Sequence, residues 1–198
     1  MSPSFKSYLS IDLDYWHKNQ SENNVVSFFA KVLRLNLPIL VVESHEVLLE
    51  SIDNCESRVL YNVDFHSDFI GDKTKEGFEE QLKKGIVDAN WVNYVQWRQY
   101  GEYVWLHPVK ECYHDKDFVD ALLQEGSGAC WGTQEDNPFE NAFHDWYHVR
   151  HHVGTSQIKW RTICGVGVSL SQDYLLGNYH IFDNLMDTLK IKKRLNHY

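Results

Sequence analysis

The chain has 198 residues with a formal net charge of −9, and 43% of its residues are hydrophobic. This is enough apolar material for one α/β domain over residues 1–198 and too little for two ample cores. The negative charge, with no basic run beyond the short segment 190–194, makes nucleic acid an unexpected partner. No stretch reaches the roughly 18 apolar residues of a membrane-spanning helix, and the N-terminus lacks a secretory signal. We therefore expect a cytoplasmic protein with no membrane partner.

Apolar runs bounded by polar or turn residues predict strands at 8–13, 39–42, 59–63, 103–106 and 162–170. Apolar residues at helical spacing predict helices at 22–35, 45–52, 75–84, 90–99, 116–125 and 182–194. Ser44 is a candidate N-cap of the second helix. Strands that alternate with helices predict an α/β fold with a mostly parallel sheet flanked by helices. Ligands of such sheets bind beyond the carboxyl ends of the strands.

Two segments late in the chain have an unusual composition. Residues 126–141 are rich in Gly, Asp, Asn and Thr, which predicts a long loop or flap, and Trp131 within it is a candidate substrate contact. The segment 144–152 holds four histidines, so a second metal site or a proton shuttle is one interpretation. Its aromatic neighbours favour instead a partly exposed amphipathic helix, with His144 and His148 on one face.

The cysteines show no pairing pattern. Cys55, Cys112, Cys130 and Cys164 are widely spaced and form no Cys-x-x-Cys pair. Such spacing indicates neither a zinc knuckle nor a disulfide framework. We expect all four to be reduced and to have structural roles.

Acids and histidines gather at three of the predicted strand ends. They are Asp12 and Asp14 after the first strand, His45 and Glu46 after the second, and Asp64, His66 and Asp68 after the third. In extended backbone, side chains two residues apart share a side, so each end can direct its ligands at one place. Four converging carboxylates would raise each other's pKa, so the cluster makes sense with cations among them. Oxygen and imidazole donors without thiolates favour manganese, iron or magnesium over structural zinc. A turn or capping pair is the alternative for Asp12 and Asp14 taken alone.

These motifs resemble those of a known family. Asp64-Phe65-His66-Ser67-Asp68 looks like the Asp-x-His-x-Asp signature of the arginase-like ureohydrolases, and Ser10-Ile11-Asp12-Leu13-Asp14 looks like their Ser-x-Asp-x-Asp. His45 then corresponds to the single histidine that precedes the first signature. The resemblance covers these three segments and the α/β pattern. In ordinary arginases the Asp-x-Asp motif comes last, so the resemblance implies an arginase/deacetylase-like fold that is circularly permuted.

The resemblance implies a dinuclear site with two Mn²⁺ per chain, or another divalent metal in their place. One ion would be held by His45, Asp64, Asp68 and Asp12, and the other by His66, Asp64, Asp12 and Asp14. Asp64 and Asp12 would bridge the ions, and a water between them would attack a guanidinium carbon to give urea and ornithine. Glu46 and Asp173 are candidate catalytic and substrate-binding residues, and an exposed glutamate in the first turn of a helix is the alternative for Glu46.

The short chain is similar to the peptide arginases, which convert arginine to ornithine within a precursor peptide. Free arginine, agmatine or another guanidine stays open as the substrate. The first alternative function is another metal-dependent amidohydrolase, such as a deacylase on the same scaffold, with one metal and a histidine base. The second is a non-catalytic binding protein that keeps its metals for stability. The sequence does not indicate an oligomeric state.

Overall fold

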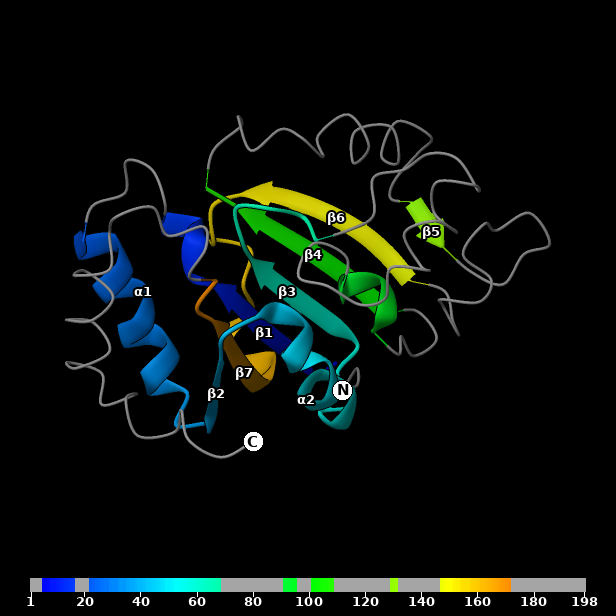
Figure 1. Ribbon diagram of the computed structural model, residues 1–198, viewed down its shortest axis with the longest axis horizontal. Coiled ribbons are helices and arrows are strands. Elements are labelled where there is room, and N and C mark those ends of the chain that lie inside the picture. Colours follow the sequence, from blue (N-terminus) through cyan, green and yellow to red (C-terminus); the bar gives the residue numbers. More distant parts are fainter. Residues whose placement is uncertain are drawn as a thin grey trace.

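The computed structural model describes residues 5–16, 22–68, 91–95, 101–108, 129–131 and 147–171. Its centre is a seven-stranded sheet in the order β2-β7-β1-β3-β4-β6-β5 (Figure 1). The strands are β1 (Ser7–Asp12), β2 (Ile39–Val42), β3 (Val59–Val63), β4 (Gly101–His107), β5 (Ala129–Trp131), β6 (Tyr147–Val153) and β7 (Ile163–Ser169). Neighbours from β2 to β6 are parallel, and β5 pairs antiparallel with β6. The predicted α/β class with a mostly parallel sheet is confirmed.

Helices and single helical turns accompany the strands. They are η1 (Leu13–Trp16), α1 (Glu22–Arg34), η2 (His45–Leu48), α2 (Leu49–Asn54), η3 (Trp91–Tyr94) and η4 (Trp160–Thr162). The predicted helix 22–35 is confirmed as α1, and the predicted helix 45–52 is η2 continued by α2. Ser44 precedes η2, but its hydroxyl donates to the Glu46 carboxylate instead of capping a backbone N–H. None of the described helices is long and apolar enough to cross a membrane.

One face of the sheet carries the hydrophobic core. Residues of β1, β2, β3, β4 and β7 point to this face, among them Leu9 and Ile11 of β1 and Val63 of β3. Phe28 and Phe29 of α1 belong to the same buried cluster, so α1 covers this face of the sheet. Burying each such side chain stabilises the fold by about 1.5–3 kcal/mol. The apolar residues on this face of the strands, together with those of α1, therefore make up the core.

The opposite face of the same strands carries polar side chains. The strand register places Ser10 beside Asn62, Asn62 beside Trp105, and Trp105 beside His151. We call Ser10, Asn62, Trp105 and His151 the polar row. Asp12 follows Ser10 on this face at the carboxyl end of β1. The polar row therefore lies next to the sheet edge at which the predicted ligands gather.

Gly167 of β7 lets η2 lie close to this polar face. A Cβ on Gly167 would come within 2.6 Å of a Leu48 methyl carbon and 2.9 Å of the Tyr8 hydroxyl oxygen. Leu48 ends η2 and His45 begins it, so the close approach of this turn also brings His45 to the sheet. A larger residue at position 167 would push the turn outward.

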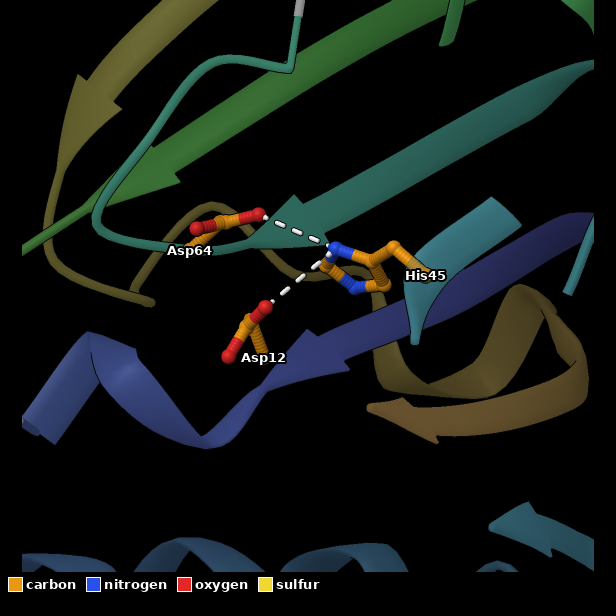
Figure 2. A group of neighbouring side chains, drawn as sticks. All are labelled: Asp12, His45 and Asp64. Atoms are coloured by element: carbon orange, nitrogen blue, oxygen red, sulfur yellow. Dashed lines mark ion pairs between the residues drawn. The ribbon is translucent and has the colours of Figure 1, made fainter. Parts of the chain in front are cut away.

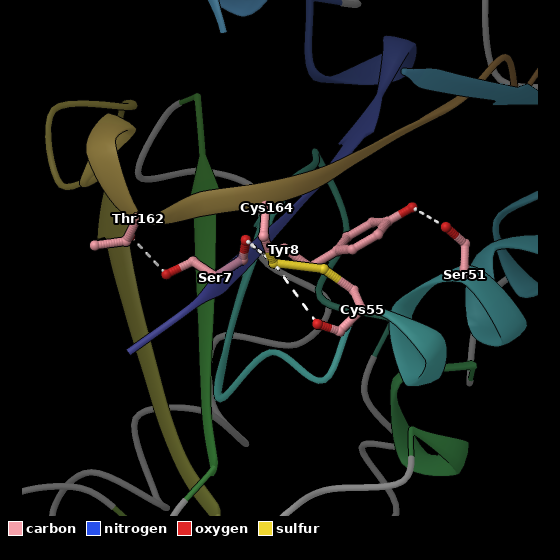
Figure 3. The surroundings of a disulfide bond; sticks show 6 residues. All are labelled: Ser7, Tyr8, Ser51, Cys55, Thr162 and Cys164. Atoms are coloured by element: carbon pink, nitrogen blue, oxygen red, sulfur yellow. Dashed lines mark hydrogen bonds between the residues drawn. A yellow bond between two sulfur atoms is a disulfide. The ribbon is translucent and has the colours of Figure 1, made fainter. Parts of the chain in front are cut away.

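A disulfide between Cys55 and Cys164 joins the end of α2 to the start of β7 (Figure 3). Next to it, the Tyr8 hydroxyl donates a hydrogen bond of 2.9 Å to Ser51 Oγ. The expectation that all four cysteines are reduced is wrong for this pair. The two residues are 109 positions apart, and the fold alone brings them together, so their spacing along the chain could not indicate the bond.

Two further predictions are wrong. The predicted amphipathic helix over 144–152 does not form over its described part, because Tyr147–Val153 hydrogen-bonds along β4 as β6. Its described histidines, His151 and His152, therefore point to opposite faces of a sheet. The predicted loop 126–141 is wrong for residues 129–131, which form the short strand β5, and its other residues lie outside the described part of the chain. The local composition could not show the pairing of β5 with β6.

Several predictions concern segments outside the described residues. These are the helices at 75–84, 116–125 and 182–194. The described part of the predicted helix 90–99 is the turn η3.

Candidate metal centre

The predicted ligands follow three strands whose carboxyl ends lie at one edge of the sheet. Asp12 is the last residue of β1, Asp64 follows β3 directly, and His45 begins η2 after β2. In Figure 2 their side chains point toward one another from three separate elements. The predicted convergence of the first and third strand ends is confirmed, since Asp14 at one end contacts His66 at the other.

The first group of ligands surrounds one nitrogen of His45. Its Nδ1 lies 3.3 Å from Asp12 Oδ2, 3.4 Å from Asp64 Oδ2 and 2.9 Å from Asp68 Oδ2. All four residues are buried, and His45 is 1% exposed. One N–H can donate well to at most one of three carboxylates, and further neutral donors would leave the negative charges of these buried carboxylates uncompensated.

The second group adjoins the first and is more open. His66 Nδ1 lies 2.9 Å from Asp14 Oδ2, and the His66 side chain is 41% exposed. Asp14, Asp64 and His66 can each direct one ligand atom to a common point, as can Asp12, His45 and Asp64. Within each group these atoms lie within 4.8 Å of one another. Asp64 therefore belongs to both groups.

The backbone that directs these ligands differs from the prediction. We expected extended backbone, but residues 13–16 form η1 and residues 64–68 form an irregular turn. The Asp12 carboxylate accepts a hydrogen bond from the Asp14 N–H at 2.9 Å, and the Asp64 carboxylate accepts one from the His66 N–H at 2.8 Å. Short aspartate side chains commonly bond to the backbone two residues on. The turn interpretation of Asp12 and Asp14 thus holds together with their convergence on the cluster.

Asp68 reaches the cluster through an uncommon backbone conformation. Its φ is 52°, in the left-handed region that aspartate tolerates better than most residues. In this conformation its carboxylate faces His45 and also accepts a hydrogen bond of 2.6 Å from the Trp91 indole N–H. A β-branched residue here would disfavour this turn as well as removing a ligand.

Burial and mutual repulsion make this cluster unfavourable when its carboxylates are all ionised. Burial raises the pKa of Asp12 to about 8, and Asp14 adds to the effect. Burial also raises the pKa of Asp64 well above its ordinary value, together with repulsion from Asp68 and Asp14. Burial alone would lower the pKa of His45, but Asp12 and Asp68 outweigh it and raise this pKa to about 9. Divalent cations would relieve the repulsion that otherwise requires bound protons.

Four neutral side chains contact the ligands of the first group. Ser10 Oγ lies 3.1 Å from His45 Nε2, and Asn62 Nδ2 donates to Asp64 Oδ2 at 3.0 Å. Trp91 donates to Asp68, and Ser171 donates to Asp12. None of these four contacts is predicted from the sequence. Ser10 and Asn62 each stand two residues before a ligand, a spacing that could have indicated them, whereas Trp91 and Ser171 carry no local signal.

The remaining predicted site residues are not part of this cluster as described. Glu46 is half-buried and accepts a hydrogen bond from Ser44, and it belongs to neither ligand group. Trp131 lies in β5, and its side chain is outside the described residues. Asp173 lies outside the described residues altogether. Their proposed catalytic and substrate-binding roles stay predictions.

A pair of histidines lies on the polar face, close to the strand end that carries Asp64. The Nε2 atom of buried His107, at the end of β4, is 3.1 Å from Nδ1 of His151 in β6. The Trp105 ring contacts that of His107, and its indole N–H donates to the Asp64 carbonyl at 3.1 Å. The sequence does not indicate this pairing, because His107 is 44 residues before His151 and the segment of His151 was predicted to be an exposed helix.

The fold and the cluster define an α/β protein with two adjoining Asp/His groups that could hold metal ions. The donors are carboxylates and imidazoles, which suits hard and borderline divalent ions such as Mn²⁺. No protein-family model matches the chain, and no curated protein or solved structure is significantly similar to it. The likeness to arginase-like ureohydrolases therefore rests on the three motifs, and the family, the reaction and the identity of the metal are proposals.

Proposed function

We propose that the chain is a metal-dependent hydrolase that binds two divalent ions, assigned as Mn²⁺, and converts arginine residues of a peptide to ornithine with release of urea. The observation that carries this proposal is the position of Asp64 between two Asp/His groups. A shared carboxylate of this kind suits two ions held close together, which is the arrangement of two-metal hydrolases. The circular permutation and the peptide substrate come from the family resemblance alone.

The proposed ligands form two sets that share one residue. His45, Asp68 and Asp12 would hold one ion, His66 and Asp14 would hold the other, and Asp64 would contact both. The resemblance implies Asp12 as a second bridge, but the group around His66 does not include Asp12. When bound, such a pair of ions lowers the pKa of a water and offsets charge that develops in the transition state. The irregular turn 64–68 and η1 would fix the ligands before substrate arrives, so little reorganisation would accompany the reaction.

The histidine pair favours a second candidate function. A deacylase on this scaffold needs one ion and a histidine base, and His107 with His151 offers two imidazoles on the same face of the sheet as Asp12. Such an enzyme would release a carboxylic acid from an acylated amine and would release no urea.

Metal content and product analysis test the proposal together. The purified chain is loaded with Mn²⁺, and bound metal is counted by elemental analysis. It is then incubated in parallel with an arginine peptide, free arginine, agmatine and an acetyl-lysine peptide. We expect two ions per chain, urea in the arginine-peptide sample, and a peptide mass that matches ornithine.

Other outcomes would favour a different function or a different substrate. One ion per chain with deacetylation supports the second candidate function, and bound metal without any turnover supports a binding protein. Urea from free arginine or agmatine but not from the peptide would retain the reaction and contradict the peptide substrate. The control is Asp64→Asn, which should lose both the metal and the turnover while keeping its circular dichroism spectrum.

A further inference from the structure

The two ligand groups differ in how they are enclosed. We call the position among Asp12, His45, Asp64 and Asp68 the inner position, and the one among Asp14, Asp64 and His66 the outer position. All ligands of the inner position are buried, whereas the His66 side chain of the outer position is 41% exposed. A cation attracts carboxylates more strongly where water is excluded, because the effective dielectric constant is lower there.

The two positions also differ in what holds their ligands. Each inner ligand has its own neutral side-chain partner: Ser10 for His45, Asn62 for Asp64, Trp91 for Asp68 and Ser171 for Asp12. Ser10 and Asn62 stand on neighbouring central strands of the sheet, so their positions are fixed by strand pairing. Such partners orient a ligand before the metal arrives and reduce the cost of ordering it on binding.

The ligands particular to the outer position are held by a different kind of contact. The Asp14 carboxylate accepts a hydrogen bond from the Phe65 N–H at 3.2 Å and faces His66. Asp14 lies in η1 and His66 lies in the turn after β3, so both residues belong to connecting segments. Its shared ligand Asp64 is also part of the inner position, so a second ion would meet a carboxylate already neutralised by the first.

We propose that the two positions are unequal: the inner position takes up its ion first and retains it, while the outer ion exchanges with solvent. Ser10, Asn62, Trp91 and Ser171 act as positioning residues for the inner ion. This inference rests on the proposed two-metal site and adds an order of binding to it. The protein would then hold one ion per chain when the metal is scarce, and the outer position would be the one that opens to a substrate.

Titration of the metal-free full-length chain with Mn²⁺ tests this order. Isothermal calorimetry should show two binding steps whose affinities differ at least about tenfold, a difference of about 1.4 kcal/mol. The electron paramagnetic resonance signal of free Mn²⁺ gives an independent count of bound ions. Brief dialysis against buffer without metal should leave one ion per chain. His66→Ala should lose the weak step and keep the tight one.

Trp91→Phe tests the positioning role, because it keeps an aromatic ring against His45 and removes the N–H that bonds Asp68. We expect the tight step to weaken by about 10- to 100-fold, the usual range for a lost partner of a metal ligand. The matched control is Trp160→Phe, because the Trp160 ring packs against Phe28 and the hydrophobic core and not against the ligands. The control should change the tight step less than about twofold.

Ser10→Ala provides a second pair of variants in case the tryptophan change disturbs folding. It deletes one hydroxyl beside His45 Nε2, and its control is Ser7→Ala in the same strand, where the hydroxyl meets Thr162 Oγ1 at 2.8 Å instead (Figure 3). Ser10→Ala should weaken the tight step and Ser7→Ala should not.

The outcomes separate the inference from the function on which it rests. Two equal binding steps, loss of the tight step in His66→Ala, or an unchanged tight step in both Trp91→Phe and Ser10→Ala would overturn the inference and leave a two-metal site in place. No binding of Mn²⁺ at all would overturn the proposed function together with the inference.

Discussion

The two faces of the central sheet carry opposite kinds of residue on the same strands. In β1, Ile11 packs into the core under α1, while its neighbours Ser10 and Asp12 face the Asp/His cluster. In β3, Val63 is in the core and Asn62 faces the cluster. Side-chain alternation thus lets each strand supply stability on one face and ligands on the other. This division predicts that a substitution on the core face lowers stability with little effect on metal binding. A substitution of a ligand next to it should weaken metal binding without lowering stability.

Asp64→Asn should give the largest effect on the polar face. Loss of the shared carboxylate should weaken binding of both ions roughly a thousandfold or more, about 4 kcal/mol each. The stability of the metal-free protein should instead increase. The raised pKa of Asp64 means that the folded chain disfavours its ionised form, and at neutral pH this opposes folding.

The asparagine removes that penalty, so the free energy of unfolding of the metal-free protein should rise at neutral pH. Urea unfolding with and without Mn²⁺ measures both effects. A metal-free Asp64→Asn protein that is less stable than the wild type would show that this carboxylate stabilises the fold without metal.

Ile11→Ala tests the other face of the same strand. Ile11 is fully buried, so its truncation should lower the free energy of unfolding by about 2–5 kcal/mol. Because its side chain points away from the cluster, the Mn²⁺ affinity of the folded fraction should stay unchanged. Calorimetry below the unfolding temperature provides the check. A large loss of affinity would mean that the two faces are coupled through the strand.

Breaking the disulfide should have a smaller effect on the fold and none on metal stoichiometry. Cys55 and Cys164 are 109 residues apart, and removing a link across a long loop typically costs about 2–4 kcal/mol. The linked segments are the end of α2 and the start of β7, away from the carboxyl ends of the strands that bear the ligands. Reductant should therefore lower the melting temperature of the wild type and leave Cys164→Ala unaffected, with equal metal content in both.

Metal binding should depend on pH, by about tenfold in affinity per pH unit for each proton displaced. Without metal, the pKa of Asp12 is about 8 and that of His45 is about 9. A cation must displace these protons, so affinity should rise as pH increases to about 9 and level off above it. Calorimetry in buffers of different ionisation enthalpy would count the protons released. A pH-independent affinity between 6 and 9 would show that the metal-free cluster is already deprotonated.

The sequence predicted the elements whose signals are local. The apolar runs that become β1, β2, β3, β4 and β7 were found, and the ligand-bearing segments were found because acids and histidines follow those runs. The histidine segment 144–152 was assigned to a helix because its residue spacing suits both structures, and pairing with β4 decides between them. Trp91 and Ser171 contact ligands 23 and 159 residues away, so no window along the chain could relate them.

The place of β7 between β1 and β2 has a consequence for how the site assembles. All six predicted ligands lie within the first 68 residues, yet Ser169 of β7 is the register partner of both Asp12 and Val42. The strand β2, which leads to His45, thus cannot reach its native position relative to Asp12 until β7, about a hundred residues later, is inserted between β1 and β2. Such a distant closure is slow relative to local pairing. A chain should therefore bind a cation with high affinity only after its sheet is complete. A nascent chain or a cleaved fragment that contains every ligand but lacks β7 should not retain the cation.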